Sequence, residues 1–334
     1  MAQTSIINRS RSSLETFAVA LALSFIGAAC YGGPEDPNDD ASQVDLAQDG
    51  HDLDESSPYE EATIDGVDSP LPDSDPRSVL EIDPDAVLID PGFLPPPPEP
   101  SDLIEKWVRS PDDRKPVPDT TLAPQRMAVM LLVTLDGQTG PCSGVMVGPD
   151  AVLTSAHCLF NPSTQRWATK VVVIPGAYPD PGNAARYKAP FGTSSGRKLF
   201  TPTNWRLGAG DVQKGHDYGV VRTNNASFVK RWRTLGYAQE PSGNVEYYGY
   251  QGDLARYQMY KTRGAIGRWL GDRANGNMEM KLSLYQGASG SAVSASGTSS
   301  VVGVMRSTSA KLNYAVFFNA SKRDELRRWI AQVL

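Results

Sequence analysis

Short apolar runs separated by turn residues fill the chain from about residue 104 onward, and they constrain its fold more than any other feature. Each run is four to six residues long and most are rich in Val, Ile or Tyr, as is typical of β-strands. They span residues 128–133, 144–147, 151–154, 170–174, 218–221, 245–250, 300–304 and 313–317. Many short strands with turns between them predict an all-β domain, either an antiparallel barrel or a sandwich.

The end of the chain has a different pattern. Leu326, Ile330 and Val333 recur at helical spacing, and Trp329 lies beside them. Ser321 precedes Lys322-Arg323-Asp324, which matches the S-x-x-D pattern of a capping box. We therefore expect a C-terminal helix that begins near Ser321 and serves as a packing element.

Charge divides the chain into two unlike parts. Residues 31–103 contain 21 Asp and Glu against a single basic residue, whereas residues 104–334 contain 29 Lys and Arg against 16 Asp and Glu. The first part is also rich in proline, with four in succession at 95–98. High charge and few apolar residues predict disorder there, so the hydrophobic core belongs to the second part.

Two short apolar islands interrupt the acidic segment, at residues 79–82 and 86–89, and either could dock onto another surface. Three interpretations of the segment remain open. It could be a stalk that holds the folded domain away from a membrane, or a propeptide that covers the basic domain electrostatically. It could equally be a solvated spacer.

The first 29 residues have the pattern of a signal peptide. Arg9 and Arg11 give a basic start, a mostly apolar run extends from Phe17 to Ala29, and small residues precede Cys30. The run is too short to span a bilayer comfortably. The sequence therefore predicts export.

Three cysteines in an exported chain leave one without a partner. Cys142 and Cys158 bracket a predicted strand-turn-strand, and a disulfide between them would contribute roughly 3 kcal/mol by loop entropy. Ile26 to Cys30 resembles a bacterial lipobox, although Gly27 stands where Leu is usual. Cys30 is thus either a lipidation site or an unpaired cysteine that is removed with the leader.

Three separated motifs supply the groups of a nucleophilic hydrolase. His157 ends an apolar strand, Asp217 begins another, and Ser289 lies in Gly287-Ala288-Ser289-Gly290-Ser291. A serine hydroxyl needs a base to accept its proton, and a carboxylate fixes the tautomer of that base. The order His, Asp, Ser is that of chymotrypsin-type hydrolases and differs from that of subtilisins and α/β-hydrolases.

The base and the nucleophile of this set each have rivals. His51 lies in the acidic segment, and His216 adjoins Asp217 on a strand, where neighbouring side chains point to opposite faces. Ser291 is the alternative nucleophile. We expect His157 as base and Ser289 as nucleophile.

The glycines around Ser289 allow the backbone to approach a substrate closely. The N–H groups of Gly287 and Ser289 are therefore expected to form the oxyanion hole, where one donor is worth roughly 3 kcal/mol in the transition state.

Residues 107–334 resemble a chymotrypsin-fold (trypsin-like) serine protease, most closely the bacterial glutamyl endopeptidase group. The resemblance is carried by Cys142-Ser143-Gly144, Ala156-His157-Cys158, Asp217-Tyr218-Gly219, Gly287 to Ser291, Asp112-Asp113-Arg114 with Asp119-Thr120-Thr121, and Asn204-Trp205-Arg206. It implies two antiparallel six-stranded β-barrels with the triad in the cleft between them. The expected organisation is a signal peptide over 1–29, an acidic linker or propeptide over 30–106, and the protease domain over 107–334.

Two positions depart from the family pattern. The strand after the nucleophile carries Met305 where the family has a histidine that recognises glutamate, and Met cannot donate a hydrogen bond to a carboxylate. Arg306 could do so if it pointed into the specificity pocket, but a solvated side chain is the expectation. Ala288 replaces the Asp with which trypsin-like zymogens capture a new N-terminus, so activation of that kind is not expected. A propeptide cut would fall near Lys106-Trp107-Val108.

The sequence has no CxxC, HExxH or P-loop pattern, so we expect neither a metal nor another cofactor. The expected partners are protein or peptide substrates and, through Cys30, a membrane. We expect a monomer that does not bind nucleic acid specifically. The predicted function is an exported serine endopeptidase, secreted or held at the cell envelope. The alternatives are a noncatalytic surface-binding lipoprotein on a protease fold and an esterase on the same fold.

Overall fold

The computed structural model describes residues 59–62, 79–81, 112–223, 232–238, 242–270, 272–295, 298, 300–308 and 313–332. The predicted signal peptide, Cys30 and the apolar island at 86–89 lie outside these residues. In the described part, no helix combines the length and the apolar character needed to cross a membrane.

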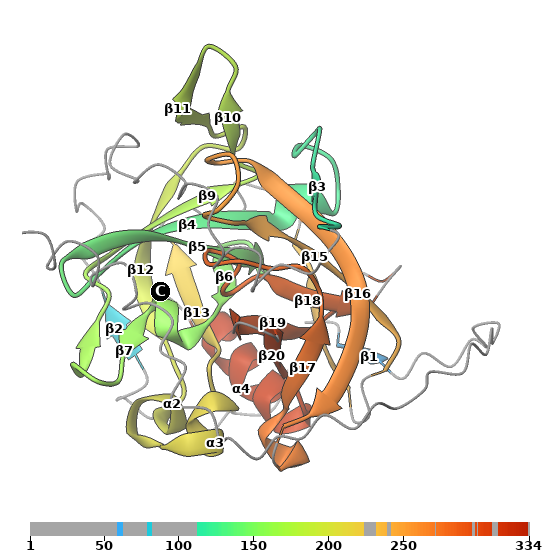
Figure 1. The fold of residues 1–334 in the computed structure, drawn as a ribbon. Coiled ribbons are helices and arrows are strands. Elements are labelled where there is room, and N and C mark those ends of the chain that lie inside the picture. The colour runs from blue at the N-terminus through green and yellow to red at the C-terminus, as the bar shows by residue number, and fades with distance from the viewer. Residues whose placement is uncertain are drawn as a thin grey trace, which may run out of the picture.

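The first half of the domain is a closed barrel of six antiparallel strands (Figure 1). Neighbouring strands of this barrel follow the order β13-β6-β5-β4-β9-β12, and β12 pairs with β13 to close the barrel. The strands are β4 (Ala128–Leu135), β5 (Gln138–Met146), β6 (Ala151–Thr154), β9 (Lys170–Pro175), β12 (Ser194–Phe200) and β13 (Gly219–Thr223).

The second half is also a closed six-stranded antiparallel barrel, ordered β19-β18-β15-β16-β17-β20 and closed by β19 with β20. Its strands are β15 (Asn244–Tyr250), β16 (Met259–Trp269), β17 (Asn277–Lys281), β18 (Ala292–Ala295), β19 (Ser300–Thr308) and β20 (Asn313–Phe317). The barrel prediction is therefore confirmed, and the sandwich alternative is wrong.

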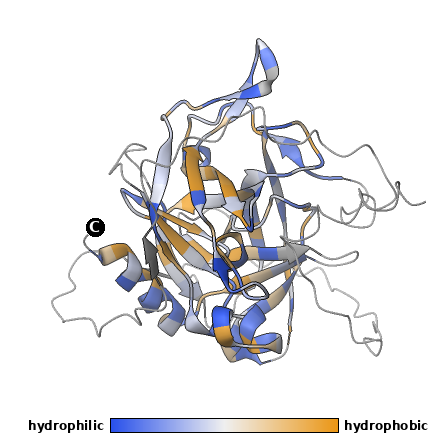
Figure 2. Cartoon of the chain, turned by 90° about the vertical axis from the view of Figure 1, so that its left-hand side faces the viewer, coloured by the Kyte–Doolittle hydropathy of each residue, from blue (hydrophilic) through white to orange (hydrophobic). Residues whose placement is uncertain are grey.

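Both faces of strand β4 are buried, which explains its unbroken apolar sequence. Val129 and Leu131 point into the first barrel, whereas Met130 and Leu132 pack with Tyr250 and the neighbouring residues of the second barrel. Burial of both faces removes apolar area from water on each side of the strand and holds the barrels together. Figure 2 shows apolar residues concentrated on the central strands and hydrophilic ones on the hairpin that projects at the top.

Short elements connect and flank the barrels. The helical turns are η3 (Gln125–Met127), η4 (Ala156–Cys158) and η5 (Arg273–Asn275), and the short helices are α2 (Thr203–Leu207) and α3 (Gly210–Lys214). The additional strands are β3 (Lys115–Pro116), β7 (Phe160–Asn161), β8 (Arg166–Trp167), β10 (Tyr178–Asp180), β11 (Asn183–Lys188) and β14 (Thr234–Ala238).

Helix α4 (Ala320–Ala331) confirms the predicted C-terminal helix, and its Leu326 and Trp329 pack into the core of the first barrel. The predicted capping box is wrong. Asn319 is the N-cap, and its side chain accepts a hydrogen bond from the amide of Lys322 at 3.0 Å. Ser321 lies inside the first turn, because an amide side chain two residues earlier already satisfies the exposed N–H group.

Two strands from the acidic segment lie on the barrels. β1 (Tyr59–Ala62) pairs with β14, and β2 (Val79–Glu81) pairs with β12. The second strand belongs to the apolar island at 79–82, which docks by adding a strand to the sheet. The prediction of disorder for the rest of residues 31–103 falls outside the described residues.

Candidate active site

His157 and Asp217 are brought together by strand pairing in the first barrel. His157 lies on η4 just after β6, and Asp217 lies two residues before β13. These strands are hydrogen-bonded neighbours, with Gly219 opposite Thr154. The register therefore places two residues that are 60 positions apart at the same end of the barrel.

Asp217 holds the histidine through both of its carboxylate oxygens. Oδ2 lies 2.7 Å from His157 Nδ1, and Oδ1 accepts the backbone N–H of His157 at 2.9 Å. The carboxylate is buried, whereas the imidazole keeps 12% of its side chain exposed. A buried carboxylate needs such partners, and this pair fixes the imidazole with Nδ1 facing the carboxylate.

His216, the rival base, has other partners. Its Nδ1 lies 2.6 Å from the carbonyl oxygen of Val212, and its Nε2 lies 3.4 Å from the amide nitrogen of Asn204. Burial lowers the pKa of His216 below its ordinary value. The contacts hold its ring against α2 and α3, while His157 takes the carboxylate of Asp217.

The turn that carries Ser289 requires glycine at two positions. Gly287 and Gly290 have φ values of +93° and +87°. A Cβ on Gly290 would overlap the hydroxyl of Thr154 and the carbonyl of Ser143. The residue after Ser289 therefore lies directly against the strand that leads to His157.

One backbone carbonyl joins the two halves of the site. The oxygen of Met305 accepts the N–H of Gly290 at 2.8 Å and the hydroxyl of Ser155 at 2.7 Å. Ser155 is two residues before His157, and Gly290 immediately follows Ser289. The fold thus brings the three predicted residues to one junction between the barrels.

Ser291, the rival nucleophile, is fully buried and donates its hydroxyl to the carbonyl of Ala288. Ser289 is placed differently: its carbonyl accepts the N–H of Ser143 at 2.8 Å, and its Oγ lies 3.4 Å from the carbonyl oxygen of Arg306. The hydroxyl of Ser291 therefore stabilises the turn from inside.

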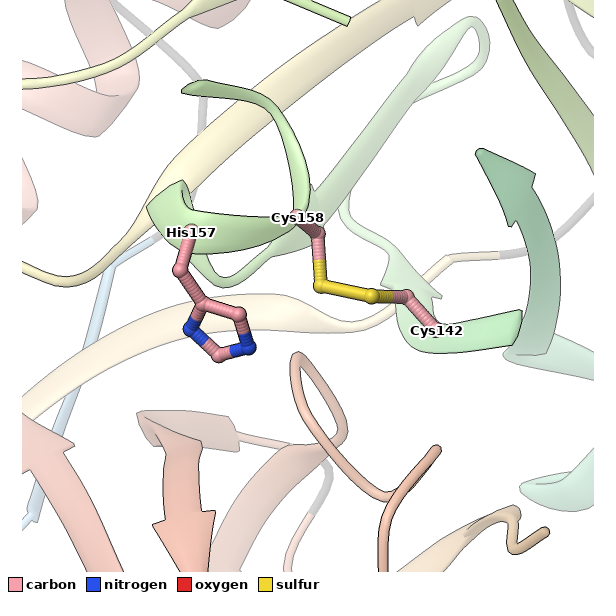
Figure 3. Close-up of side chains that lie close together, drawn as sticks. All are labelled: Cys142, His157 and Cys158. Atoms are coloured by element: carbon pink, nitrogen blue, oxygen red, sulfur yellow. A yellow bond between two sulfur atoms is a disulfide. The ribbon is translucent and has the colours of Figure 1, made fainter. Parts of the chain in front are cut away.

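A disulfide links Cys142 of β5 to Cys158 of η4, next to His157 (Figure 3). The predicted pairing is confirmed. In the described part of the chain, these cysteines and His157 are the group whose ligand atoms lie close enough for a metal ion, within 4.8 Å. Their sulfurs are bonded to each other and offer no thiolate, so the group does not fit a metal.

Met305 and Arg306 are both buried on β19. Met305 packs in the apolar cluster of the second barrel with Tyr247 and Phe317. The guanidinium of Arg306 lies over the ring of Tyr314, 5.1 Å from its centroid. The expectation of a solvated Arg306 is therefore wrong, because the aromatic face and the strand enclose it.

Ser143 links three segments of the site, a role that no sequence motif predicts. Its hydroxyl accepts the N–H of Tyr250 at 2.9 Å and donates to the carbonyl of Gly287 at 2.8 Å. A lone serine beside an apolar run is a weak signal for such a role, since a serine at a strand is usually a satisfied structural residue.

Comparison with known proteins finds similarity to two Bacillus proteases, one of which is named a metalloprotease. A scan against protein families finds no match. The glutamyl endopeptidase of Bacillus licheniformis is 30% identical over 172 residues, 51% of this chain and 44% of that protein. The extracellular metalloprotease of Bacillus subtilis is 27% identical over 142 residues, 42% of this chain and 37% of that protein. The chain thus matches less than half the length of either curated relative.

Solved structures match almost the whole described domain. A Glu endopeptidase in complex with MPD has a TM-score of 0.58 at 21% identity and covers 67% of this chain and 100% of that one. Protease Anisep from Arthrobacter nicotinovorans has a TM-score of 0.54 at 15% identity and covers 66% of this chain and 100% of that one. The domain therefore has the chymotrypsin-type fold of serine proteases, as the sequence resemblance indicated.

Proposed function

We propose that this chain is an exported serine endopeptidase that hydrolyses peptide bonds through an acyl-enzyme. The observation that carries the proposal is the His157–Asp217 pair, which is joined by two hydrogen bonds. This pair lies next to the Ser289 turn at one junction of a chymotrypsin-type fold. Fold alone does not define activity, so the geometry of this site is what supports the proposal.

In the first step, Ser289 Oγ attacks the carbonyl carbon of the substrate while His157 Nε2 accepts the hydroxyl proton. Asp217 keeps the Nδ1–H donor in place and stabilises the imidazolium. The tetrahedral intermediate then collapses, the C–N bond breaks, and His157 returns the proton to the leaving amine. An acyl-Ser289 ester remains.

In the second step, water gives a proton to His157 and attacks the ester. The acid product leaves, and Ser289 regains its proton. In both steps the N–H groups of Gly287 and Ser289 stabilise the negative oxygen, and such donors contribute most when they are fixed in advance. The positive φ of Gly287 supports this role.

For specificity, we propose that Met305 and Arg306 belong to the wall of the pocket for the residue before the cut. The named glutamate preference of the Bacillus licheniformis relative is not extended to this chain, because Met305 replaces the expected hydrogen-bond donor. A peptide-library cleavage profile of wild type and Arg306→Leu tests the proposal. An unchanged cleavage profile in Arg306→Leu would show that Arg306 does not belong to the pocket.

We also propose that residues 1–29 direct export, that Cys30 carries a lipid, and that residues 30–106 are a propeptide or a tether before the protease domain at 107–334. N-terminal sequencing and mass spectrometry of the exported protein separate these alternatives. A lipid-modified Cys30 start supports a tether, whereas a start near Lys106 supports a removed propeptide.

A fluorophosphonate probe tests the catalytic proposal, because it labels only an activated serine. We expect wild-type labelling that is lost in Ser289→Ala and retained in Ser291→Ala. Absence of wild-type labelling, in the full chain and after removal of residues 1–106, would favour a noncatalytic scaffold. Hydrolysis of esters without matched amides would favour an esterase.

A further inference from the structure

The side chain of Arg114 lies at the centre of a buried ion cluster outside the residues assigned above. Its Nη1 and Nη2 donate to the two oxygens of Asp253 at 2.9 and 2.7 Å. Nη1 also donates to Gln251 Oε1 at 2.7 Å, and Nε and Nη2 donate to Asp112 at 2.9 and 2.8 Å. The side chains of Arg114 and Asp253 are only 2% and 1% exposed.

Arg114 enters this cluster from the segment that leads into the domain. That segment runs along β16, where β3 pairs with Tyr260 and Lys261, and the N–H of Val117 donates to the carbonyl of Met259 at 2.9 Å. The guanidinium is thus held on a backbone that is itself fixed. A bidentate pair of this kind restricts orientation as well as distance.

The partners of Arg114 flank the residue that holds the Ser289 turn. Gln251 and Asp253 lie on either side of Gly252, whose N–H donates to the carbonyl of Gln286 at 2.7 Å. The Gln286–Gly287 peptide is trans, so its N–H points opposite to its C=O. By holding the carbonyl of Gln286, Gly252 therefore decides where the N–H of Gly287 points.

The neighbouring peptide is held as well. Ser143 Oγ donates to the carbonyl of Gly287, and a Cβ on Gly287 would lie 3.0 Å from the carbonyl oxygen of Tyr250. Ala288 offers no carboxylate that could tie this turn to a chain terminus. Among the described residues, the Arg114–Asp253 ion pair lies next to Gly252, which hydrogen-bonds to this turn.

We propose that Arg114 is a positioning residue: by fixing Gln251 and Asp253 it holds the Gln286–Gly287 peptide with the N–H of Gly287 toward the oxyanion. The proposal rests on the proposed serine endopeptidase function. It assigns to a cation from the entry segment of the domain a role in positioning the oxyanion hole. No free N-terminus is needed for this contact, because the cation is a side chain.

The first test is the kinetics of Arg114→Met in the full chain. An oxyanion donor acts in the transition state, so we expect kcat to fall roughly 10- to 100-fold with KM changed less than about threefold. Arg222→Met is the matched control, since Arg222 is another buried arginine with a bidentate carboxylate, Asp150, in the first barrel. The control should lower the melting temperature and leave kcat unchanged.

A second variant separates positioning from stability. Arg114→Met leaves Asp253 buried without its cation, which is destabilising, whereas Arg114→Met/Asp253→Leu removes both charges. We expect the double variant to recover thermal stability and to keep the low kcat. Wild-type kcat in the double variant would overturn the proposal.

Amide hydrogen exchange gives a readout that does not need turnover. In Arg114→Lys, which keeps the charge but not the bidentate geometry, the Gly252 amide should exchange at least tenfold faster than in wild type. An unchanged rate would overturn the proposal even if all variants were inactive. A wild type without labelling or hydrolysis would instead overturn the proposed function, and the exchange result would still decide the role of Arg114.

Discussion

At the scale of single residues, Gly290 is a position where the surrounding backbone and side chains leave no room for a side chain. Its φ is +87°, and a Cβ would overlap Thr154 and Ser143, which belong to the His157 side of the site. A side chain here would have to push apart two segments that hydrogen bonds hold together. The glycine is thus required by contact and by conformation at the same time.

Gly290→Ala should therefore lower the free energy of unfolding by about 2 kcal/mol or more and abolish fluorophosphonate labelling. Gly140→Ala is the control, because a Cβ at that position meets nothing within 4 Å and the backbone is not left-handed. Urea unfolding and labelling of both variants check the expectation. Equal behaviour of the two variants would contradict it.

Lys322 is a buried cation at the base of the Asp217 turn. Its Nζ donates to the carbonyl of Gly215 at 2.7 Å and to the carbonyl of Asn275. Burial lowers its pKa to about 7, although the nearby Glu325 opposes the shift. The lysine thus connects helix α4 to both barrels with an amine that loses its proton more easily than usual.

This pKa predicts a pH dependence of stability. Between about pH 7 and the ordinary lysine pKa of 10.5, the unfolded chain binds a proton that the folded chain does not, so stability should rise with pH. Lys322→Met should flatten this rise by about 1 kcal/mol per pH unit, measured by urea unfolding at pH 7, 8 and 9. The more exposed Lys214→Met should keep the wild-type slope, and an unchanged slope in Lys322→Met would contradict the assignment.

At the scale of elements, the disulfide and the cap of α4 give independent tests. The Cys142–Cys158 bond closes a segment with a sequence separation of 16 and joins β5 to η4. The double substitution Cys142→Ser/Cys158→Ser should lower the free energy of unfolding by about 3 kcal/mol, because the unfolded chain gains freedom. Denaturant unfolding measures the loss, and a change below about 1 kcal/mol would show that the loop is already constrained.

The N-cap prediction compares two neighbouring residues. Asn319→Ala should cost about 1 kcal/mol, because the amide of Lys322 loses its acceptor. Ser321 is the second residue of the helix, and Ser321→Ala should change the free energy of unfolding by less than about 0.5 kcal/mol. Thermal unfolding of the two variants distinguishes them. A larger loss of stability in Ser321→Ala than in Asn319→Ala would support the capping box that begins at Ser321.

At the scale of the whole molecule, each barrel is closed by its own strands. β12 pairs with β13 and β19 pairs with β20, whereas β1 and β2 are added outside these rings. Removal of residues 1–106 should therefore leave a folded domain with a melting temperature within about 5 °C of the full chain. Calorimetry of both forms tests this, and failure of the short form to fold cooperatively would assign a structural role to the acidic segment.

Local sequence patterns predicted eight of the twelve described barrel strands, the C-terminal helix and the disulfide pair, and they named His157, Asp217 and Ser289 as candidate site residues. They missed β12, β16, β17 and β18, in which polar or small residues interrupt the apolar ones. Alternation, helical spacing and glycine-flanked motifs act over a few residues, so they can be read locally. The cap that Asn319 provides for α4, the contact of Arg306 with Tyr314 and the pairing of Arg114 with Asp253 depend instead on the tertiary arrangement. Arg114 and Asp253 are 139 residues apart, and their contact depends on how the entry segment aligns with β16. Such alignments follow from strand pairing and barrel packing, which no local pattern specifies.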